Sequence, residues 1–376
     1  MSLDLFITCA ETLEPLLVKE LHDIGYVDAK PSFRGVTLPY SMQAVYEINY
    51  LSRLAGRVLL PLAKFPCKDA KELYTQAKKL DWLKYISENK TLAIDVNGKH
   101  KAFNNTLYAA QVLKDALCDH CKEICGKRPS VNVQSPDVQL SLFLQNDYVT
   151  ISLDTSGEPL FKRGYRRECV TAPLQESLAA AFLMMANYKG DEILLDVCCG
   201  SGTLLIEAAL MATRTPPGYL RRKWGFFNLP EYSETAFEDV KKIHQAKICP
   251  LKEGLLYGYE INRENVRIAN VNIRTAGFHD GIQVMKGAFQ EGMLSILPNL
   301  VICNPPHGLR LEDEESLKPL YRALGDFFKH KMAKPSKAFI FTTSPVLAKE
   351  VGLKPHKRHI VKSSGDEGRL LEFDIY

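Results

Sequence analysis

The sequence predicts an α/β protein in which an α+β region precedes a doubly wound, mostly parallel sheet. From about residue 173 onward, apolar segments of strand length alternate with helical segments, as in parallel sheets covered on both faces. Before residue 155, short strands and helices also alternate, but Asn146-Asp147 joins the last two strands in a turn typical of an antiparallel hairpin. The length of 376 residues allows about two or three folding units.

The composition is that of an ordinary globular protein. Hydrophobic residues make up 46% and charged residues 24%, which excludes disorder over most of the chain. No run of about 18 apolar residues occurs, so we expect no transmembrane helix and no membrane partner. The N-terminal segment lacks the basic start and unbroken apolar centre of a secretory signal, which favours a cytoplasmic protein. The net charge of +4 neither requires nor excludes nucleic acid.

In the first half, hydrophobic periodicity predicts four helices between short strands. The first helix is expected to end at Gly25, which suits a C-cap. The expected helices are 12–24, 41–52, 69–79 and 104–125, and the expected strands are 3–8, 34–39, 60–66, 91–98, 131–134, 138–145 and 148–155.

A cluster of Cys118, His120, Cys121 and Cys125 raises the question of a zinc site. Its spacing lacks the second, distant ligand pair that structural zinc sites use. The same residues fit one amphipathic helix, with Cys121 on the apolar stripe. Buried helix cysteines are therefore favoured, no metal is expected, and the ten cysteines of the chain are expected to be reduced thiols.

Residues 157–169 (GEPLFKRGYRREC) interrupt the alternation of strands and helices. A solvated run of charges is the simplest interpretation. The position of the segment between two domains makes phosphate binding more plausible here. The charged and aromatic residues concerned are Lys162, Arg163, Tyr165, Arg166 and Arg167.

The second half is expected to contain the parallel sheet. A closing hairpin would add an antiparallel edge to it. The expected strands are 193–198, 255–260, 282–286, 299–303, 337–343 and 369–375, and the expected helices are 174–188, 203–212, 263–275 and 317–331.

The segment ILLDVCCGSGTLLIEAAL, residues 193–210, carries the first functional signal. An apolar strand ends in Asp196, a turn with Gly200 and Gly202 follows, and an apolar helix begins. Glycines let the backbone approach a ligand, and ligands of open α/β sheets bind at the carboxyl ends of strands. A dinucleotide fingerprint would need glycine where this chain has Leu205, and a P-loop would need a following lysine. The D-x-x-x-G-x-G pattern instead resembles the S-adenosylmethionine motif of class I methyltransferases.

The segment YGYEIN, residues 257–262, carries the second signal. Glu260 ends an apolar strand, and a helix begins at about Arg263. A carboxylate there can accept hydrogen bonds from both ribose hydroxyls of a nucleoside. Equally, it can complement the dipole of the helix. Residues 213–233, rich in proline, arginine and aromatic residues, are interpreted as an insertion before this strand.

The segment NLVICNPPHG, residues 299–308, carries the third signal. Two prolines after a strand fix the backbone and remove two N–H donors. The Asn304 side-chain oxygen and the Pro305 carbonyl can then accept both hydrogens of an amino group, which orients its lone pair for in-line methyl transfer. The ring of His307 can stack on a planar base. With the two upstream motifs, this predicts methylation of an exocyclic amino nitrogen rather than a plain proline turn.

The NPPH tetrapeptide is similar to the [ND]-PP-[YFW] motif of amino-group methyltransferases that act on nucleic-acid bases. With GEPLFKRGYRRECVTAPLQESLAAAFL, DVCCGSGTLLIEAALMA, PPGYLRRKWGFF and NPPHGLRL, the chain resembles bacterial THUMP-domain ribosomal RNA methyltransferases. Among these it resembles the guanine-N2 enzymes of large-subunit RNA, in their single-methyltransferase form. The resemblance implies a ferredoxin-like domain at 1–63, a THUMP RNA-binding domain at 64–156, a basic linker at 157–172 and a Rossmann-like methyltransferase domain at 173–376.

The resemblance also implies roles for individual residues, with Glu260 on the ribose and Ile261 against the adenine. Residues expected to bind S-adenosylmethionine are Thr171, Ala172, Pro173, Leu174, Asp196, Cys199, Gly200, Ser201, Gly202, Thr203, Glu260, Ile261, Ala288 and Phe289. Those expected at the target base are Asn304, Pro305, Pro306 and His307. RNA is expected to contact Lys162, Arg163, Tyr165, Arg166 and Arg167.

Two positions depart from the family pattern. Ala288 stands where relatives often have an acidic residue, so a backbone carbonyl or Gln290 would have to accept from the adenine amino group. His307 replaces the usual Tyr or Phe, and its ring stacks less strongly and titrates near neutral pH.

The resemblance thus implies S-adenosylmethionine-dependent methylation of guanine N2 in ribosomal RNA, with 23S RNA or a pre-ribosomal particle as partner and no DNA. Three alternatives stay open. The enzyme could act on another base, such as adenine N6 or a tRNA guanine. The chain could be a non-catalytic RNA-binding assembly factor. A nicotinamide-dependent oxidoreductase is disfavoured by the missing third glycine. The oligomeric state is not indicated.

Overall fold

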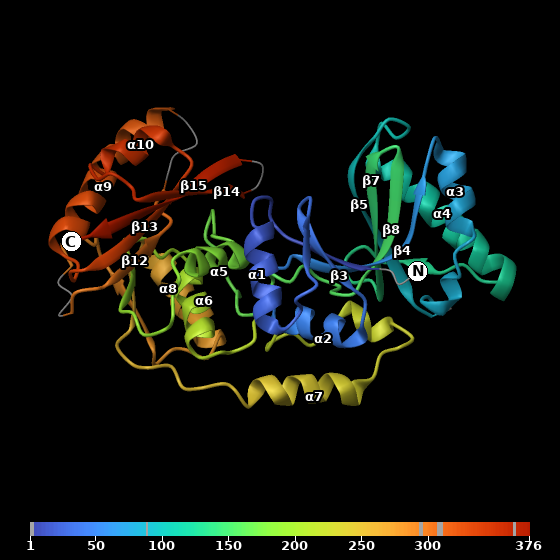
Figure 1. Cartoon of the computed structure of the whole chain (residues 1–376), viewed down its shortest axis with the longest axis horizontal. Coiled ribbons are helices and arrows are strands. Elements are labelled where there is room, and N and C mark those ends of the chain that lie inside the picture. Colours follow the sequence, from blue (N-terminus) through green and yellow to red (C-terminus); the bar gives the residue numbers. More distant parts are fainter. Residues whose placement is uncertain (1–3, 88, 293–295, 307–310, 364–365) are drawn as a thin grey trace. The chain divides into compact units, whose positions relative to one another are not determined.

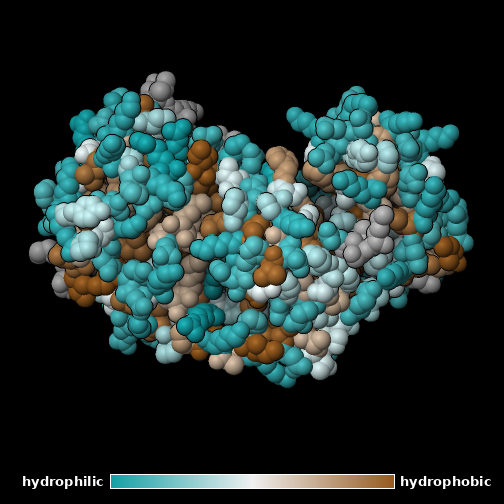
Figure 2. Space-filling model, viewed as in Figure 1, coloured by the Kyte–Doolittle hydropathy of each residue, from teal (hydrophilic) through white to brown (hydrophobic). Residues whose placement is uncertain are grey.

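The computed structural model describes residues 4–87, 89–292, 296–306, 311–363 and 366–376 (Figure 1). The chain forms two compact units. The first contains residues 1–9, 17–160 and 221–241, and the second contains residues 10–16, 161–220 and 242–376. In the part of the chain that the structure describes, no helix has both the length and the apolar character needed to cross a membrane. The face shown in Figure 2 is mostly hydrophilic, with small, scattered apolar patches.

The first unit is built on one mixed sheet in the order β2-β3-β1-β4-β8-β7-β5-β6. Strand β4 is central, because its first residues pair with β1 and its residues from Leu59 to Pro66 pair with β8, with one bulge between Pro61 and Ala63. The proposed division between residues 63 and 64 therefore falls within a strand that both N-terminal domains share. The strands are β1 (Asp4–Thr8), β2 (Lys30–Ser32), β3 (Gly35–Pro39), β4 (Arg57–Pro66), β5 (Thr91–His100), β6 (Ser130–Val131), β7 (Val138–Asn146) and β8 (Tyr148–Asp154).

The expected β7–β8 hairpin is confirmed, with Asn146 at a φ of 52° in the turn. Strands β5 and β7 pair in parallel, which local sequence does not reveal. The expected helices form as α1 (Glu14–Ile24), α2 (Met42–Leu51), α3 (Ala70–Lys78) and α4 (Thr106–Cys125).

Helix α4 contains the cysteine cluster. Asn105 caps its start and Gly126, in the left-handed conformation, follows its end. Cys118 and Cys121 are buried, and burial raises the pKa of the Cys121 thiol to about 11. His120 uses Nδ1 to contact the Lys78 carbonyl oxygen at 2.9 Å. The helical interpretation is confirmed, and the described residues contain no group of three potential metal ligands.

Part of the insertion before β10 belongs to the first unit. Residues 221–241 include a 3-10 turn (Gly225–Asn228) and most of helix α7 (Glu234–Gln245), which we did not predict. The Phe226 ring lies 5.2 Å from Tyr46 and 4.9 Å from Phe237, measured between centroids. Residues 221–241 of the expected methyltransferase domain at 173–376 thus belong to the first compact unit.

The second unit contains the predicted doubly wound sheet, in the order β11-β10-β9-β12-β13-β15-β14. The first five strands in this order, β11, β10, β9, β12 and β13, are parallel. The β14–β15 hairpin supplies the expected antiparallel edge. The strands are β9 (Leu194–Asp196), β10 (Leu256–Glu260), β11 (Ile282–Lys286), β12 (Leu300–Cys303), β13 (Ser336–Thr342), β14 (Lys357–Ser363) and β15 (Asp366–Ile375).

Helices cover both faces of this sheet, as Figure 1 shows. Leu194 belongs to the apolar cluster on the α5, α6 and α8 face, and Leu195 belongs to the cluster on the α9 and α10 face. Because successive residues of a strand point to opposite faces, burial on both faces explains the unbroken apolar strands. The helices are α5 (Glu176–Met185), α6 (Thr203–Ala212), α8 (Arg263–Thr275), α9 (Leu311–His330) and α10 (Pro345–Glu350).

Candidate cofactor and substrate site

A cavity of about 640 Å³ opens at the carboxyl ends of β9, β10 and β12. This is the sheet edge at which doubly wound folds bind ligands. The structure brings most of the predicted site residues together around it: Thr171, Ala172, Pro173, Leu174, Asp196, Cys199, Gly200, Ser201, Thr203, Glu260, Ile261, Ala288, Phe289, Asn304, Pro305 and Pro306. Gly202 is not among the residues that line the cavity, and His307 is outside the described residues.

The turn after β9 has the geometry that its glycines predict. Gly200 and Gly202 have φ values of 54° and 79°, in the left-handed region that glycine adopts without strain. Gly202 caps the start of α6, and its N–H donates to the Cys199 carbonyl oxygen at 2.8 Å. On the neighbouring strand, a Cβ on Gly258 would lie 2.9 Å from the Cys199 sulfur. Glycine at 258 therefore lets the turn pack directly on β10.

Asp196 is a buried carboxylate, 4% exposed, in the wall of this cavity. Its Oδ1 accepts a hydrogen bond from the Cys198 N–H at 3.1 Å. Burial raises the pKa of this carboxyl to about 7, and the charge of Glu260 also acts to raise it. A cationic ligand beside Asp196 would offset both effects and favour the ionised form.

Glu260, at the end of β10, is hydrogen-bonded to the glycine turn that follows β9. Its Oε2 accepts from the Gly200 N–H at 3.0 Å and its Oε1 from the Asn262 N–H at 2.8 Å. An ionised carboxylate has about four acceptor positions, so both oxygens can still accept from ribose hydroxyls. The next residue, Ile261, is 72% exposed at the cavity, in a position that suits contact with a flat base.

Beyond β11, Ala288 and Phe289 also reach the cavity. Phe289 is buried, and its ring meets that of Phe327 edge-on at 5.6 Å. Gln290, the suggested substitute for the missing acidic side chain, lines the cavity and is exposed. An amide acceptor is therefore available beside Ala288.

Asn304 follows the last residue of β12 and has an unusual environment. Its Oδ1 is buried and has no hydrogen-bond partner among the described residues. Leaving a buried acceptor unsatisfied costs about 1–3 kcal/mol. Pro305 is buried and Pro306 exposed, both at the cavity. The site thus presents an oriented acceptor that an N–H donor of a ligand would satisfy.

The basic segment corrects one of our predictions. Lys162 and Arg167 are not fully buried, but Arg163 and Tyr165 are each only 1% exposed. The Arg163 guanidinium lies 3.5 Å from Glu207 Oε1, and the Tyr165 hydroxyl donates to the same oxygen at 2.9 Å. Glu207 is fully buried in α6. The prediction that Arg163 and Tyr165 contact RNA is wrong, because their polar groups face the interior.

Arg166 also points inward, and three of its hydrogen-bond partners, Leu174, Ser201 and Thr203, line the cavity. Its Nε donates to Glu176 Oε1 at 2.8 Å, and one terminal nitrogen donates to Ser201 Oγ at 3.1 Å. The other donates to the Leu174 carbonyl oxygen at 2.8 Å and to Thr203 Oγ1 at 3.0 Å. These hydrogen bonds argue against the predicted RNA contact of Arg166, which remains a prediction. The side chain connects the segment before α5 to the glycine turn.

Comparison with known proteins identifies the family. The RMKL-like methyltransferase domain matches residues 163–369, the THUMP domain residues 67–154 and the RlmL ferredoxin-like domain residues 4–59. The chain belongs to the RMKL-like methyltransferase family. This confirms the predicted fold class and family, and S-adenosylmethionine is the cofactor that they indicate.

Two relatives show how the family members differ in length. The chain is 35% identical to the ribosomal RNA large subunit methyltransferase K/L of Syntrophotalea carbinolica, over 98% of this chain and 53% of that protein. A Synechocystis protein, provisionally named an RNA methyltransferase, is 32% identical over 99% of this chain and 96% of its own length. The chain thus spans about half the length of the K/L relatives and most of the Synechocystis protein.

Two solved structures share the whole architecture. The SMU.472 protein, described provisionally as a methyltransferase and complexed with SAH, is 25% identical with a TM-score of 0.88, covering 99% of this chain and 97% of that one. A Listeria monocytogenes protein, described from its sequence as an N6-adenine-specific DNA methylase, is 26% identical with a TM-score of 0.86, covering 99% and 96%.

Sequence reasoning missed several residues that line the cavity. Asn262 caps α8, and its Oδ1 accepts from the Glu264 N–H at 2.8 Å. Its place directly after a strand and before a helix was a usable signal. Leu320 reaches the cavity from α9, and no local pattern could have found it. The remaining unpredicted lining residues are Val170, Val197, Cys198, Leu204, Asn265, Gly287 and Gln290, the last considered only as a substitute acceptor.

Proposed function

We propose that this chain transfers a methyl group from S-adenosylmethionine to an exocyclic amino nitrogen of an RNA base, namely guanine N2 in large-subunit ribosomal RNA. The buried, unpartnered Oδ1 of Asn304 carries the proposal. It lies in the same cavity as the residues expected to hold the cofactor. An amino group of a base is a donor of the kind this acceptor lacks.

The residues that line the cavity match the cofactor in charge and chemistry. Asp196 and the glycine turn would hold the cationic methionine part, Glu260 the ribose hydroxyls and Ile261 the adenine. When bound, the cofactor supplies an electrophilic methyl group. The chain's own residues position this group against the nucleophile.

The turn after β12 would position the nucleophile. With Asn304 Oδ1 accepting one amino hydrogen and the Pro305 carbonyl oxygen accepting the other, the nitrogen lone pair faces the methyl group. The amine proton leaves after the transfer, so no strong base is required. Stacking of the target base on His307 remains a prediction, since that residue lies outside the described part of the chain.

The choice of substrate is supported by relatives rather than by the cavity alone. Several K/L proteins, at 34–37% identity, are named for ribosomal RNA of the large subunit. This favours 23S RNA, or a pre-ribosomal particle containing it, as the partner. The name of the Listeria neighbour favours adenine N6 as the second candidate. Both bases present an amino group that the Asn304 acceptor could orient.

Single-turnover methyl transfer to unmodified ribosomal RNA tests the proposal. Asn304→Ala removes one acceptor, and by analogy with deleting one preorganised hydrogen-bond partner the rate should fall about 10²-fold or more. Asn304→Asp should retain more activity, because a carboxylate oxygen still accepts. Cofactor affinity, measured by calorimetry, should change little in either variant.

A fully active Asn304→Ala enzyme would contradict the amino-methyltransferase assignment. Mass mapping of the modified nucleoside in RNA treated with the wild type decides between the two bases. N2-methylguanosine is the expected product, and N6-methyladenosine would overturn the guanine proposal.

A further inference from the structure

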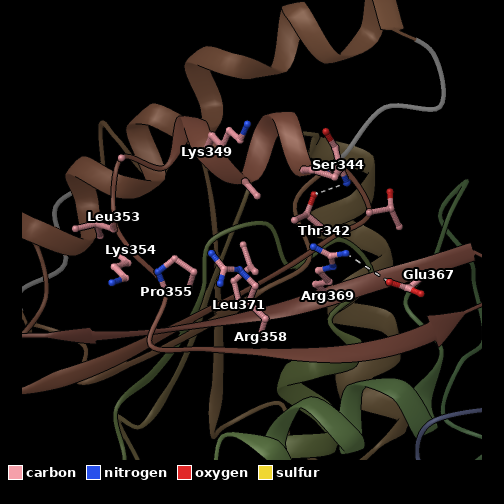
Figure 3. Close-up of a pocket in the computed structure, with 14 residues that line it drawn as sticks. Thr342, Ser344, Lys349, Leu353, Lys354, Pro355, Arg358, Glu367, Arg369 and Leu371 are labelled. Carbon is pink, nitrogen blue, oxygen red and sulfur yellow. Dashed lines mark hydrogen bonds and ion pairs between the residues drawn. The ribbon is translucent and has the colours of Figure 1, made fainter.

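A second concave surface lies on the α9 and α10 face of the same sheet. It is a groove of about 710 Å³ between the β13–β15–β14 strands and α10 with the loop that follows (Figure 3). Arg358 and Arg369 extend toward α10 from the two strands of the hairpin, and Lys354 lies in the loop after the helix. Lys349 comes from α10 itself. We call this surface the basic groove.

The charges of the basic groove are mainly positive. Four cations, Lys349, Lys354, Arg358 and Arg369, line it together with a single carboxylate, that of Glu367. Glu367 lies 3.6 Å from Arg369. Within the described ranges, Lys349, Lys354 and Arg358 form no ion pair with any residue. The groove therefore has unbalanced positive charge in a concave setting, which attracts anions.

Strand register places the groove next to the turn that bears Asn304. Cys303, the residue before Asn304, pairs with Ile340 on β13, which pairs with Leu371 on β15, and Leu371 pairs with Arg358 on β14. Arg358 is thus level with the end of β12, three strand spacings or about 14 Å away. Arg369 pairs with Thr342 at the carboxyl end of β13 and is one strand closer.

We propose that the basic groove binds phosphates of the RNA strand next to the target nucleotide. This inference deepens the proposed function and rests on it. Arginine guanidinium groups match phosphate oxygens with paired donors, and lysines add charge without sequence preference. The proposal also gives this unit an RNA surface in place of Arg163, Tyr165 and Arg166, which point inward.

The test measures RNA binding directly, without methyl transfer. A triple variant, Lys349→Ala with Lys354→Ala and Arg358→Ala, is titrated against an unmodified large-subunit RNA fragment over a range of salt concentrations. For each phosphate of single-stranded RNA that the variant no longer binds, the slope of log affinity against log salt should decrease by roughly 0.7. Affinity at low salt should fall as well.

Lys357→Ala is the matched control. Lys357 is exposed on the same strand as Arg358, directly before it, so its side chain belongs to the opposite face of the hairpin and does not line the groove. Its removal should leave the salt slope unchanged. Cofactor affinity, measured by calorimetry, should be equal in all variants, which shows that the second unit is folded.

Two results would overturn the groove as an RNA site. One is a salt slope in the triple variant equal to that of the wild type, and the other is an equal decrease in the Lys357→Ala control. If the triple variant shows the expected slope change but the wild type methylates no base, the proposed function fails while the groove assignment stands.

Discussion

At the scale of single residues, the candidate site combines two polar groups that are costly to bury, the Asp196 carboxyl and the Asn304 side-chain oxygen. Asp196 is a buried carboxyl whose pKa is raised to about 7 by burial, with Glu260 nearby. Asn304 Oδ1 is a buried acceptor without a partner among the described residues. Groups with perturbed electrostatics of this kind concentrate at functional sites. In the proposed reaction, the cationic cofactor would lie beside Asp196, and the amino group of the base would donate to Asn304 Oδ1.

The raised pKa of Asp196 predicts pH-dependent cofactor binding. Below about pH 7 the free protein holds this carboxyl mostly protonated, and a cation beside it favours the ionised form. Binding at acidic pH must therefore release a proton, so affinity should rise with pH, by up to about tenfold per unit between roughly pH 5.5 and 7. Calorimetry in buffers of different ionisation enthalpy measures the proton release directly.

Asp196→Asn is the control for this effect, because it keeps the shape and cannot ionise. Its affinity should be lower and independent of pH over the same range. A wild type that releases no proton on binding would contradict the pKa assignment. The effect on folding has the opposite sign: burial raises the pKa of Asp196, so the folded chain binds more protons than the unfolded chain and this contribution to stability decreases as the pH rises from about 4 to 7.

At the scale of elements, residues 163–166 of the second unit form internal contacts that brace the cavity wall. Tyr165 and Arg163 contact Glu207 of α6, and Arg166 connects Leu174, α5 and the glycine turn. A run of basic residues has the same appearance in sequence whether its partners are phosphates or buried carboxylates. Only the burial of the side chains distinguishes the two kinds of partner. Here that burial depends on the packing of α6 against the segment.

Arg166 is accordingly predicted to be a positioning residue for the cofactor. Arg166→Ala should weaken S-adenosylmethionine binding by about 1.5–3 kcal/mol, as expected for the loss of charge-assisted hydrogen bonds that hold the two cavity segments. The neighbour Arg167, whose side chain is not held in this network, is the matched control, and Arg167→Ala should leave cofactor affinity unchanged. Calorimetry measures both.

RNA titrations separate this role from a phosphate contact. The salt slope should be the same for wild type and Arg166→Ala. A lower slope with unchanged cofactor affinity would restore the original interpretation of Arg166 as an RNA ligand.

At the scale of the whole molecule, one segment belongs to a different compact unit from the residues that flank it in the sequence. Residues 221–241 lie between β9 and β10 in the chain but belong to the first unit, where Phe226 and Phe237 pack with Tyr46. The insertion is therefore a structural part of the N-terminal unit. Its aromatic composition, visible in the sequence, has its explanation in that packing.

Phe226→Ala should destabilise the first unit by about 3–5 kcal/mol, because a fully buried aromatic side chain is removed from a packed cluster. Phe227, the next residue and 37% exposed, is the matched control with a smaller expected cost. Urea unfolding measures the loss. Equal losses for the two variants, or a parallel loss of cofactor affinity, would contradict the assignment of this segment to the first unit.

The sequence by itself determined the second unit's alternation of strands and helices, the glycine turn after Asp196, and the positions of Glu260 and Asn304 at strand ends. These features are local, since periodicity and turn chemistry specify each element, and parallel strands then bring their carboxyl ends to one edge. Only the tertiary structure decided that Arg163 and Arg166 face inward, that β4 serves both N-terminal domains, that Leu320 reaches the cavity, and that distant cations form the basic groove. Those outcomes depend on which elements pack together, and no short stretch of sequence encodes that choice.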